Sequence, residues 1–489
     1  MNYLKNLAGQ TAIYGLSSVV PRLLNYLLVP LYTRVFLPEE FGIVTEMYAY
    51  LAFLLILLTY GMETGYFRFA TKEDDSNTTY STAFYALLTS SSIFIVLVSL
   101  FSNNIVGILG YPNNPEYVVY LAIIIGLDAF SAIPFARLRL NNKAFTFSLI
   151  KISGVVVNVI LNFFFLKICP QFDYFQTIGI YNPSLGVTYV FLSNLISSIL
   201  VTILLLFTQG TLPTYFSLQK LKLLAVYSLP LLISGLGGTT NESFDRIFLK
   251  YLVPADTNPL YQLGIYGSNV KIAVLMVLFI QMYRYAAEPF FFSTSGDKNS
   301  PQIYSNMLKY FLVFTLLIFL GVGLFTDIFQ FLVGKDFREG LGVVPILLLA
   351  NLFYGVFFNL SIWYKLTNKT WYGIYYTFAG AALTMTLYFI LIPQIGYYGA
   401  AIARLACYIL MTVLCFLGGR RHFPIPYDLR RMSIYFLSGI VIFLAGYFIH
   451  FNIYVISFVF RISLIALFLV IVLHYEKVKF STLLSLVKR

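Results

Sequence analysis

The hydrophobic residues of this chain fall into long stretches that are separated by short polar segments. A helix needs about 20 mostly apolar residues to cross the hydrocarbon core of a bilayer, and fourteen stretches reach spanning length. They lie at 10–33, 41–63, 80–101, 116–136, 149–167, 184–207, 225–252, 262–284, 306–325, 341–363, 372–392, 397–417, 432–449 and 453–474. The pattern predicts an all-α polytopic membrane protein with about 14 transmembrane helices and no long soluble domain between them.

The first twelve stretches form two sets of six, because polar and glycine positions recur between the sets in the same order. The recurring pairs include Arg34 with Lys250, Pro38 with Pro254, Tyr80 with Tyr304, Ser81 with Ser305, Asn142 with Asn368, Gly154 with Gly380, and Gly186 with Gly396. We therefore predict two parallel six-helix repeats, an N-lobe at 1–210 and a C-lobe at 211–420. Helices thirteen and fourteen and a cytoplasmic tail follow at 421–489.

Each predicted repeat has an even number of helices, so both repeats enter the membrane from the same side. Parallel repeats of this kind are related by a pseudo-twofold axis along the membrane normal. Two similar halves in a membrane are typical of transporters, which expose a central site to each side in turn.

Basic residues are distributed unevenly between the segments that would face the two sides of the membrane. With the N-terminus inside, 22 of the 32 Lys and Arg residues lie in inward segments, six in outward segments and four within spans. The positive-inside rule then predicts that both termini are cytoplasmic. The net charge of +12 indicates topology, with weak attraction to anionic membrane lipids, and we expect no nucleic-acid partner.

The composition excludes a soluble protein, and it supplies few residues of the kinds that form a catalytic site. Hydrophobic residues make up 59% of the chain and charged residues 11%, whereas soluble domains are about 25% charged. The three cysteines have no close spacing, and the three histidines lie in loops or at span ends, which predicts no metal site, disulfide framework or catalytic cluster. In the longest outer loop, about 168–183, Asp173 is the one acid or base.

Several segments together resemble the Wzx-type polysaccharide and O-antigen flippases of bacteria, which share a superfamily with MATE exporters and the MurJ flippase. The segments are GQTAIYGLSS at 9–18, PR at 21–22, PLYTR at 30–34, FGI at 41–43 and GMETGYFRF at 61–69. The resemblance covers essentially the whole chain and is strongest over 1–75.

The resemblance implies a function in the bacterial cytoplasmic membrane. The implied substrate is an undecaprenyl-pyrophosphate-linked oligosaccharide, moved from the inner to the outer leaflet by alternating access for O-antigen, capsule or exopolysaccharide synthesis. Membrane lipids and other polysaccharide-assembly proteins are the further partners that it implies. It implies no bound cofactor, although coupling to a proton or sodium gradient is left open.

Two other classes of function compete with the flippase. A MATE-like exporter of small cations would need a net acidic cavity, whereas the deepest charge here is Arg22. A membrane-embedded polysaccharide polymerase would need positioned acids or bases at a face open to water, usually on a sizeable outer loop. The sequence offers no such group, so we interpret the protein as a transporter and not an enzyme.

Polar residues within the spans are the candidate substrate-binding residues, because a charge at the bilayer centre costs at least about 2.5–3.5 kcal/mol. Arg22 lies about 12 residues, or roughly 18 Å, from both ends of its helix, and Asn25 shares its face. We predict that Arg22, Asn25 and Lys271 line the cavity, where a guanidinium would bind pyrophosphate in bidentate fashion. The alternative for Arg22 is a structural pair with an acid such as Asp128.

A second group of polar residues has two interpretations, ion coupling or internal pairing. It consists of Asp128, Asn241, Glu242 and Asp245. Glu242 and Asp245 are three residues apart and should share a helix face, with Arg246 beside them. The nearby Pro230 and glycines predict a helix that can bend. For Arg404 and Arg461, snorkelling to the membrane surface or structural pairing is the favoured interpretation. Glu288 is interpreted as an interfacial charge and not as a binding site.

Overall fold

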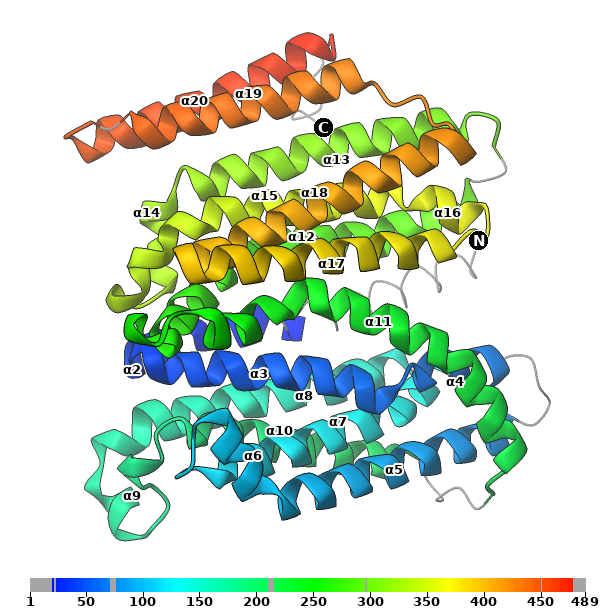
Figure 1. The fold of residues 1–489 in the computed structure, drawn as a ribbon, viewed down its shortest axis with the longest axis vertical. Helices are drawn as coiled ribbons and strands as arrows, with labels where there is room; N and C mark the ends of the chain where they lie inside the picture. The colour runs from blue at the N-terminus through cyan, green and yellow to red at the C-terminus, as the bar shows by residue number, and fades with distance from the viewer. Residues whose placement is uncertain are drawn as a thin grey trace. The chain divides into compact units, whose positions relative to one another are not determined.

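The computed structural model describes residues 20–21, 23–70, 76–209, 215–294, 297–449 and 451–477, and Figure 1 shows their fold. Within these residues the chain is helical without strands, and 13 helices are long and apolar enough to cross a membrane. Each predicted span after the first coincides with one of them. The first, 10–33, lies mostly outside the described residues. The all-α membrane fold class is therefore confirmed.

The chain packs into two compact units. Unit 1 comprises Met1–Ser268 and Gly334–Phe337, and unit 2 comprises Asn269–Val333 and Arg338–Arg489. The units are defined by packing, whereas the predicted lobes are defined by the sequence repeat. The lobe boundaries at residues 210 and 420 therefore stay a prediction.

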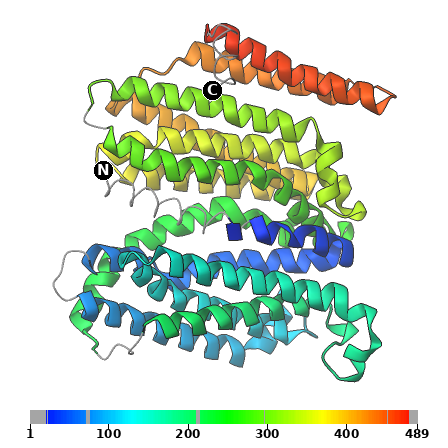
Figure 2. The same ribbon diagram turned by 180° about the vertical axis from the view of Figure 1, so that it is seen from behind.

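Unit 1 contains the helices of the first predicted repeat, the whole of α11 and the start of α12 (Figures 1 and 2). Its helices are α2 (Leu28–Val35), α3 (Pro38–Thr59), α4 (Met62–Ala70), α5 (Ser76–Leu100), α6 (Ser102–Leu109), α7 (Pro115–Leu140), α8 (Ala144–Phe163), α9 (Asp173–Thr177), α10 (Thr188–Gln209) and α11 (Leu218–Leu252). A π-helical turn, η1 (Phe164–Ile168), extends α8. Buried aromatic and small residues of α4, α5 and α7, with Leu224 of α11, form one of its cores.

Unit 2 contains the rest of α12 and the remaining helices. They are α12 (Pro259–Ser293), α13 (Ser300–Gly323), α14 (Thr326–Phe329), α15 (Val343–Leu360), α16 (Ile362–Leu366), α17 (Trp371–Ile395), α18 (Tyr397–His422), α19 (Leu429–Phe448) and α20 (Tyr454–Tyr475). The 3₁₀ segment η6 (Lys335–Gly342) precedes α15 and crosses the boundary between the units. Buried aromatic residues are prominent in the core of unit 2, and Trp363 of α16 is among the largest fully buried side chains.

The turns after α7 and α16 have the same local geometry. Asn142 and Asn368 each have φ +57°, a left-handed conformation that asparagine tolerates better than most residues. The next N–H in each turn, that of Lys143 or Lys369, donates to a carbonyl five residues earlier at 2.9 and 2.8 Å respectively. This is the Schellman bond that ends a helix. Both turns occupy equivalent positions in the predicted repeat, and superposition of the whole lobes stays a prediction.

Gly154 of α8 and Gly380 of α17 each allow a neighbouring helix to approach closely. A Cβ on Gly154 would lie 2.4 Å from Val201 Cγ2 of α10, and a Cβ on Gly380 would lie 2.8 Å from Met411 Cγ of α18. Val201 and Met411 are 210 positions apart, which is the offset of the predicted repeat in this region. The two repeats thus use a glycine for the same helix contact, because close approach strengthens van der Waals packing between helices in lipid.

Leucine at Gly154 is expected to lower the free energy of unfolding by about 1–3 kcal/mol, because the added side chain would overpack the contact with α10. Unfolding by SDS in mixed micelles would measure the change. Gly107→Leu on α6 is the matched control, since no atom lies within 4 Å of a Cβ built there. An equal loss of stability in both variants would contradict this account of Gly154.

Ion pairs hold α20 at two points along its length. Beyond its last turn, Glu476 accepts hydrogen bonds from Lys309 Nζ of α13 at 2.8 Å and from Tyr435 of α19 at 2.7 Å. Nearer its start, Arg461 lies 2.7 Å from Asp327 of α14. Pairing is one of the two structural roles predicted for Arg461, and the structure shows it.

The bonds to Glu476 predict a stability that depends on pH. Burial alone would raise its pKa, but the bonds from Lys309 and Tyr435 outweigh burial and hold the pKa below the ordinary value of 4.5. A depressed carboxyl pKa stabilises the fold above that ordinary value, and this contribution is lost as the pH falls through the folded-state pKa. Glu476→Gln should cost about 1–3 kcal/mol at neutral pH and remove the extra loss of stability on acidification below about pH 4.5. Unfolding curves at pH 4 and pH 7 would measure both effects, and an unchanged pH dependence would contradict the assignment.

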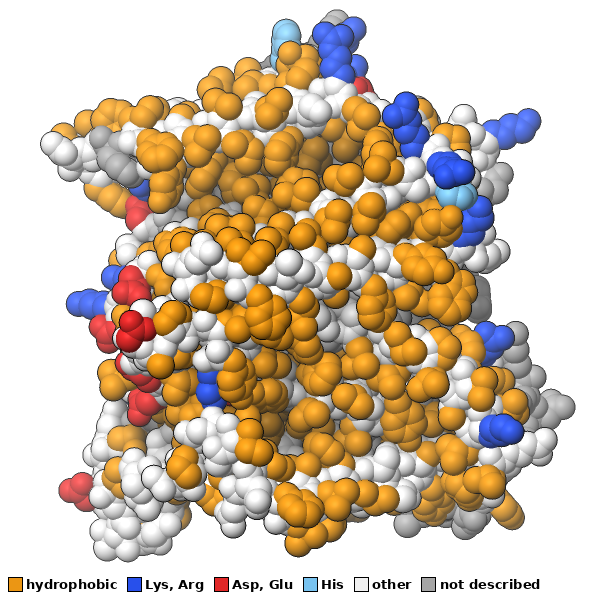
Figure 3. Space-filling model, viewed as in Figure 1, with side chains coloured by type: hydrophobic (Ala, Val, Ile, Leu, Met, Phe, Trp, Pro, Cys, Tyr) orange, Lys and Arg blue, Asp and Glu red, His pale blue; other side chains and the backbone are white. Residues whose placement is uncertain are grey.

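Figure 3 shows where charged side chains lie on one face of each unit. In unit 1, lysine and arginine lie mostly toward the end where α4 is found, and in unit 2 they lie mostly toward the end where α16 is found. The largely apolar surface of each unit is consistent with helices that cross a bilayer. Which end of each unit faces the cytoplasm stays a prediction from the positive-inside rule.

Candidate functional site

The three predicted substrate-binding residues have different placements. Arg22 lies outside the described residues, and the side chain of Asn25 is exposed. Lys271 is half-buried within α12, in the part that belongs to unit 2. The proposed cavity role of these residues therefore stays a prediction.

The polar residues of α11 separate onto two faces. Asn241 and Asp245, one turn apart, are 2% and 0% exposed, whereas Glu242 is exposed. The hydroxyl of Tyr266 on α12 donates to Asp245 Oδ2 at 2.5 Å, and the backbone N–H of Arg246 donates to Asp245 Oδ1 at 2.9 Å. Asn241 and Asp245 thus belong together in the interior, and Glu242 does not join them. The helix runs unbroken through its glycines and curves along its length (Figure 1).

Asp128 of α7 bonds within unit 1. The hydroxyl of Ser198 on α10 donates to its Oδ1 at 2.9 Å. One turn along, Thr202 donates to the Ser198 carbonyl and lies 3.2 Å from the hydroxyl of Ser131. Asp128 therefore ends a short row of hydroxyl groups between α7 and α10, and its predicted pair with Arg22 lies outside the described residues.

Other polar side chains of unit 1 bond α2 to α8 and α10 to α3. Tyr32 donates to Asn162 Oδ1 at 2.9 Å, and Asn162 in turn donates to the side chain of Asn158 at 3.0 Å. Asn194 of α10 donates to the hydroxyl of Tyr48 at 3.2 Å. Asparagine and tyrosine pairs of this kind join transmembrane helices.

The described part of unit 1 contains a buried ion pair that the sequence analysis did not identify. Glu46 of α3 has an exposure of 0%, and Lys250 Nζ near the end of α11 lies 2.8 Å from each of its carboxylate oxygens. Lys250 also donates to the Leu109 carbonyl at 2.5 Å and lies 3.2 Å from the hydroxyl of Tyr111. Tyr111 donates to Glu46 Oε2 at 2.5 Å. The side chains of Glu46, Lys250 and Tyr111 therefore form hydrogen bonds to one another in a largely buried cluster.

Tyr111 keeps its proton in this cluster. It lies in the loop between α6 and α7, where burial first and the Glu46 carboxylate second raise the pKa of its phenol well above the ordinary value. Its ring lies beneath Lys250 Nζ, at 4.2 Å from the centroid, so it adds a cation–π contact to the hydrogen bond. The signal for the cluster was present in the sequence, because an acid at position 46 falls within an apolar span and such acids seek partners.

Other charges near span ends form pairs at the periphery. Glu63 pairs with Arg139, and Glu288 pairs with Lys365 at 2.7 Å. These contacts agree with structural roles for Glu63 and Glu288.

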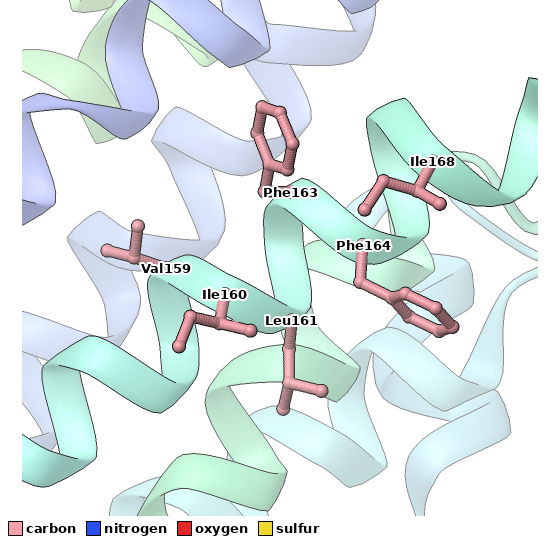
Figure 4. A pocket seen from close by; sticks show the side chains of 6 residues that line it. All are labelled: Val159, Ile160, Leu161, Phe163, Phe164 and Ile168. Atoms are coloured by element: carbon pink, nitrogen blue, oxygen red, sulfur yellow. The ribbon is translucent and has the colours of Figure 1, made fainter.

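Figure 4 shows a cavity of 580 Å³ beside α8 and its π-helical turn. Six apolar side chains line it, namely Val159, Ile160, Leu161, Phe163, Phe164 and Ile168. A sugar or a pyrophosphate needs hydrogen-bond donors that this lining lacks. The cavity is therefore no site for the polar part of a lipid-linked sugar.

The fold is one that membrane transporters share. The structure of the lipid II flippase MurJ in its inward closed conformation is similar with a TM-score of 0.74 at 15% identity, covering 95% of this chain and 99% of that chain. An inward-facing multidrug MATE transporter of the MOP superfamily gives 0.62 at 14% identity, covering 85% and 95%. An outward-facing MATE transporter gives 0.58 at 16% identity, covering 88% and 96%. The protein is thus a multi-pass membrane protein with the MurJ and MATE transporter fold.

Within that class, residues 7–295 match the family model described as polysaccharide biosynthesis protein. The match covers more than half of the 489 residues. The chain therefore belongs to the polysaccharide biosynthesis protein family, which agrees with the resemblance found in its sequence. No curated protein matches it.

Proposed function

We propose that this protein is a flippase that moves an undecaprenyl-pyrophosphate-linked oligosaccharide across the bacterial cytoplasmic membrane. The observation that carries the proposal is the combination of a polysaccharide-biosynthesis family match with a transporter fold along almost the whole chain. A family that contributes to polysaccharide synthesis through a transporter fold needs a substrate that must cross the membrane. A lipid-linked repeat unit of O-antigen, capsule or exopolysaccharide meets that requirement.

The proposed mechanism is alternating access driven by binding at the centre of the membrane. Arg22 holds the pyrophosphate, because that group is anionic whatever sugar it carries, and Asn25 and Lys271 assist it. The attraction must stay modest, since a site that binds too tightly would not release its substrate. Asp128, Asn241 and Asp245 are proposed as the groups through which a proton or sodium gradient could drive the cycle, because buried polar groups in transporters serve that purpose.

The proposal is tested by removing the protein from the bacterium that encodes it and identifying the lipid-linked sugar that accumulates. We expect an undecaprenyl-pyrophosphate oligosaccharide that is accessible to a sugar-oxidising reagent in inverted membrane vesicles but protected in right-side-out vesicles. Re-expression of the protein should restore surface polysaccharide. Equal accessibility in both kinds of vesicle would contradict the proposal.

A MATE-like exporter of small molecules is the second candidate, because MATE transporters share the fold. Binding separates the two functions. The flippase should bind undecaprenyl pyrophosphate in detergent and should not bind a tetraphenylphosphonium cation, whereas an exporter of cations should show the opposite preference.

A further inference from the structure

Three helix ends from different predicted repeats meet within unit 1. α3 belongs to the first repeat, and α11 and α12 open the second. Glu46 is the ninth of the 22 residues of α3, Lys250 lies two residues before the end of α11, and α12 begins at Pro259. By the predicted topology, all three lie toward the outer surface of the membrane.

α3 and α12 touch through their backbones at this end. A Cβ on Gly42 would lie 2.2 Å from the Leu260 carbonyl oxygen, and a Cβ on Gly264 would lie 1.8 Å from the Pro38 carbonyl oxygen. One turn deeper, a Cβ on Gly267 would lie 3.0 Å from Thr45 Cβ. The start of α3 therefore leaves no space between itself and α12.

α3 and α11 are joined beside this contact by polar bonds. The Glu46–Lys250 ion pair is capped by Tyr111, and the hydroxyls of Tyr50 and Tyr251 lie 2.9 Å apart one turn further along α3. Since α3 and α11 come from different predicted repeats, every one of these bonds between them also joins the two repeats.

We infer that the Glu46–Lys250 pair is a latch that holds the outer ends of the two repeats together in one state of the transport cycle and opens in the other. Alternating access requires contacts between the repeats at one surface to break when that surface opens. Within unit 1 the repeats also meet where α11 packs against α4 and α5 and where Gly334 donates to Thr33 of α2. The latch is a charged contact between the repeats at their predicted outer end.

The chemistry of the pair suits a contact that must open and close. Burial of two charges costs hydration free energy that largely offsets their attraction, so the net stabilisation of a buried ion pair is small. When α3 and α11 separate, water can hydrate both charges, and the hydration free energy that was lost on burial is regained. Apolar groups gain no favourable hydration when they are exposed. An apolar interface of equal strength would therefore cost more free energy to open.

The equivalent positions of the repeats differ in charge. At the offset of 216 that matches Arg34 with Lys250, Glu46 corresponds to Gln262. Arg34 is exposed and donates to the Pro30 carbonyl of its own helix at 2.8 Å. The position equivalent to Glu46 therefore holds an amide and not an acid.

Thiol labelling tests the latch without any transport measurement. Thr45 is 9% exposed and faces Gly267, so Thr45→Cys should react slowly with a membrane-impermeant methanethiosulfonate added to intact cells. Adding Glu46→Gln, which leaves Lys250 without its counterion, should raise the labelling rate at least fivefold, whereas the apolar pair Glu46→Leu with Lys250→Met should not raise it. Adding Lys250→Arg, which keeps the charge, should leave the rate within twofold. Equal rates in all backgrounds would overturn the latch.

A disulfide tests whether the latch must open for transport. With Thr45→Cys and Gly267→Cys, the two Cβ atoms would lie about 3 Å apart, so a shift of under about 1 Å would bring them to the spacing of about 3.8 Å in a disulfide. Oxidation should stop transport of the lipid-linked sugar, and a reductant should restore it. The matched control is Gly154→Cys with Val201→Cys, whose Cβ atoms would lie 3.9 Å apart within one repeat. Its oxidation should not affect transport, and undiminished transport by the oxidised 45–267 variant would overturn the latch.

The labelling result does not depend on the proposed substrate, whereas the disulfide result does. Accelerated labelling together with no accumulation of lipid-linked sugar would therefore keep the latch and reject the flippase. Unchanged labelling with normal accumulation would keep the flippase and reject the latch.

Discussion

Replacing Lys250 with methionine is expected to lower the free energy of unfolding by about 3–5 kcal/mol, since the change leaves the fully buried Glu46 carboxylate without its cation. Removing both charges at once should be far less harmful. The variant with Glu46→Leu and Lys250→Met replaces the pair by apolar side chains of similar volume, and such replacements are often neutral. Unfolding by SDS in mixed micelles would measure both variants and the single Glu46→Leu change.

The double-mutant cycle separates a coupled pair from two independent contributions. Coupling requires that the two single changes together cost well over the double change, by more than about 1 kcal/mol. Additive effects would mean that Glu46 and Lys250 stabilise the fold through other contacts. Lys335→Met provides a matched control, because it removes an exposed lysine at the start of η6 and should cost less than about 0.5 kcal/mol.

Replacing Arg22 with alanine is expected to abolish transport while leaving folded protein in the membrane. A single cation at this depth would bind the pyrophosphate in both inward-open and outward-open states. Arg22→Lys keeps the charge but loses the bidentate geometry, so it should retain part of the activity. Surface polysaccharide and accumulated lipid-linked sugar, measured in cells that express each variant, report the outcome.

The controls distinguish a binding role from a structural one. Arg34→Ala removes an exposed guanidinium from the same N-terminal segment and should leave transport intact. Full transport by stable Arg22→Ala would exclude a role in the cavity. Loss of folded protein in Arg22→Ala would favour the structural pair with an acid such as Asp128.

The length of the apolar stretches was sufficient to predict the spans that the structure describes. Thirteen predicted stretches each coincide with a helix, because the bilayer leaves the backbone no alternative to internal hydrogen bonding. The sequence repeat likewise predicted equivalent local features, such as the left-handed Asn142 and Asn368. Such features depend on a few neighbouring residues and therefore survive in a comparison of sequences.

The polar residues of α11 show a limit of predicting shared helix faces from sequence spacing. A spacing of three residues suggested that Glu242 and Asp245 share a face, yet Glu242 is exposed and Asp245 is fully buried. A helix turns about 100° per residue, so residues three apart diverge by about 60°, enough to separate them at the edge of a packed face. Asp245 instead bonds Tyr266, a partner supplied by the next helix.

The sequence by itself determined the fold class, the number of spans after the first, the asymmetry of charge and the family, because these depend on composition and order along the chain. Only the tertiary structure decided which charges meet. Glu46 and Lys250 are 204 positions apart, and no periodicity relates an acid within one span to a lysine near the end of another. Their contact exists because α3 and α11 pack side by side, and the cost of burying either charge alone then makes each the required partner of the other.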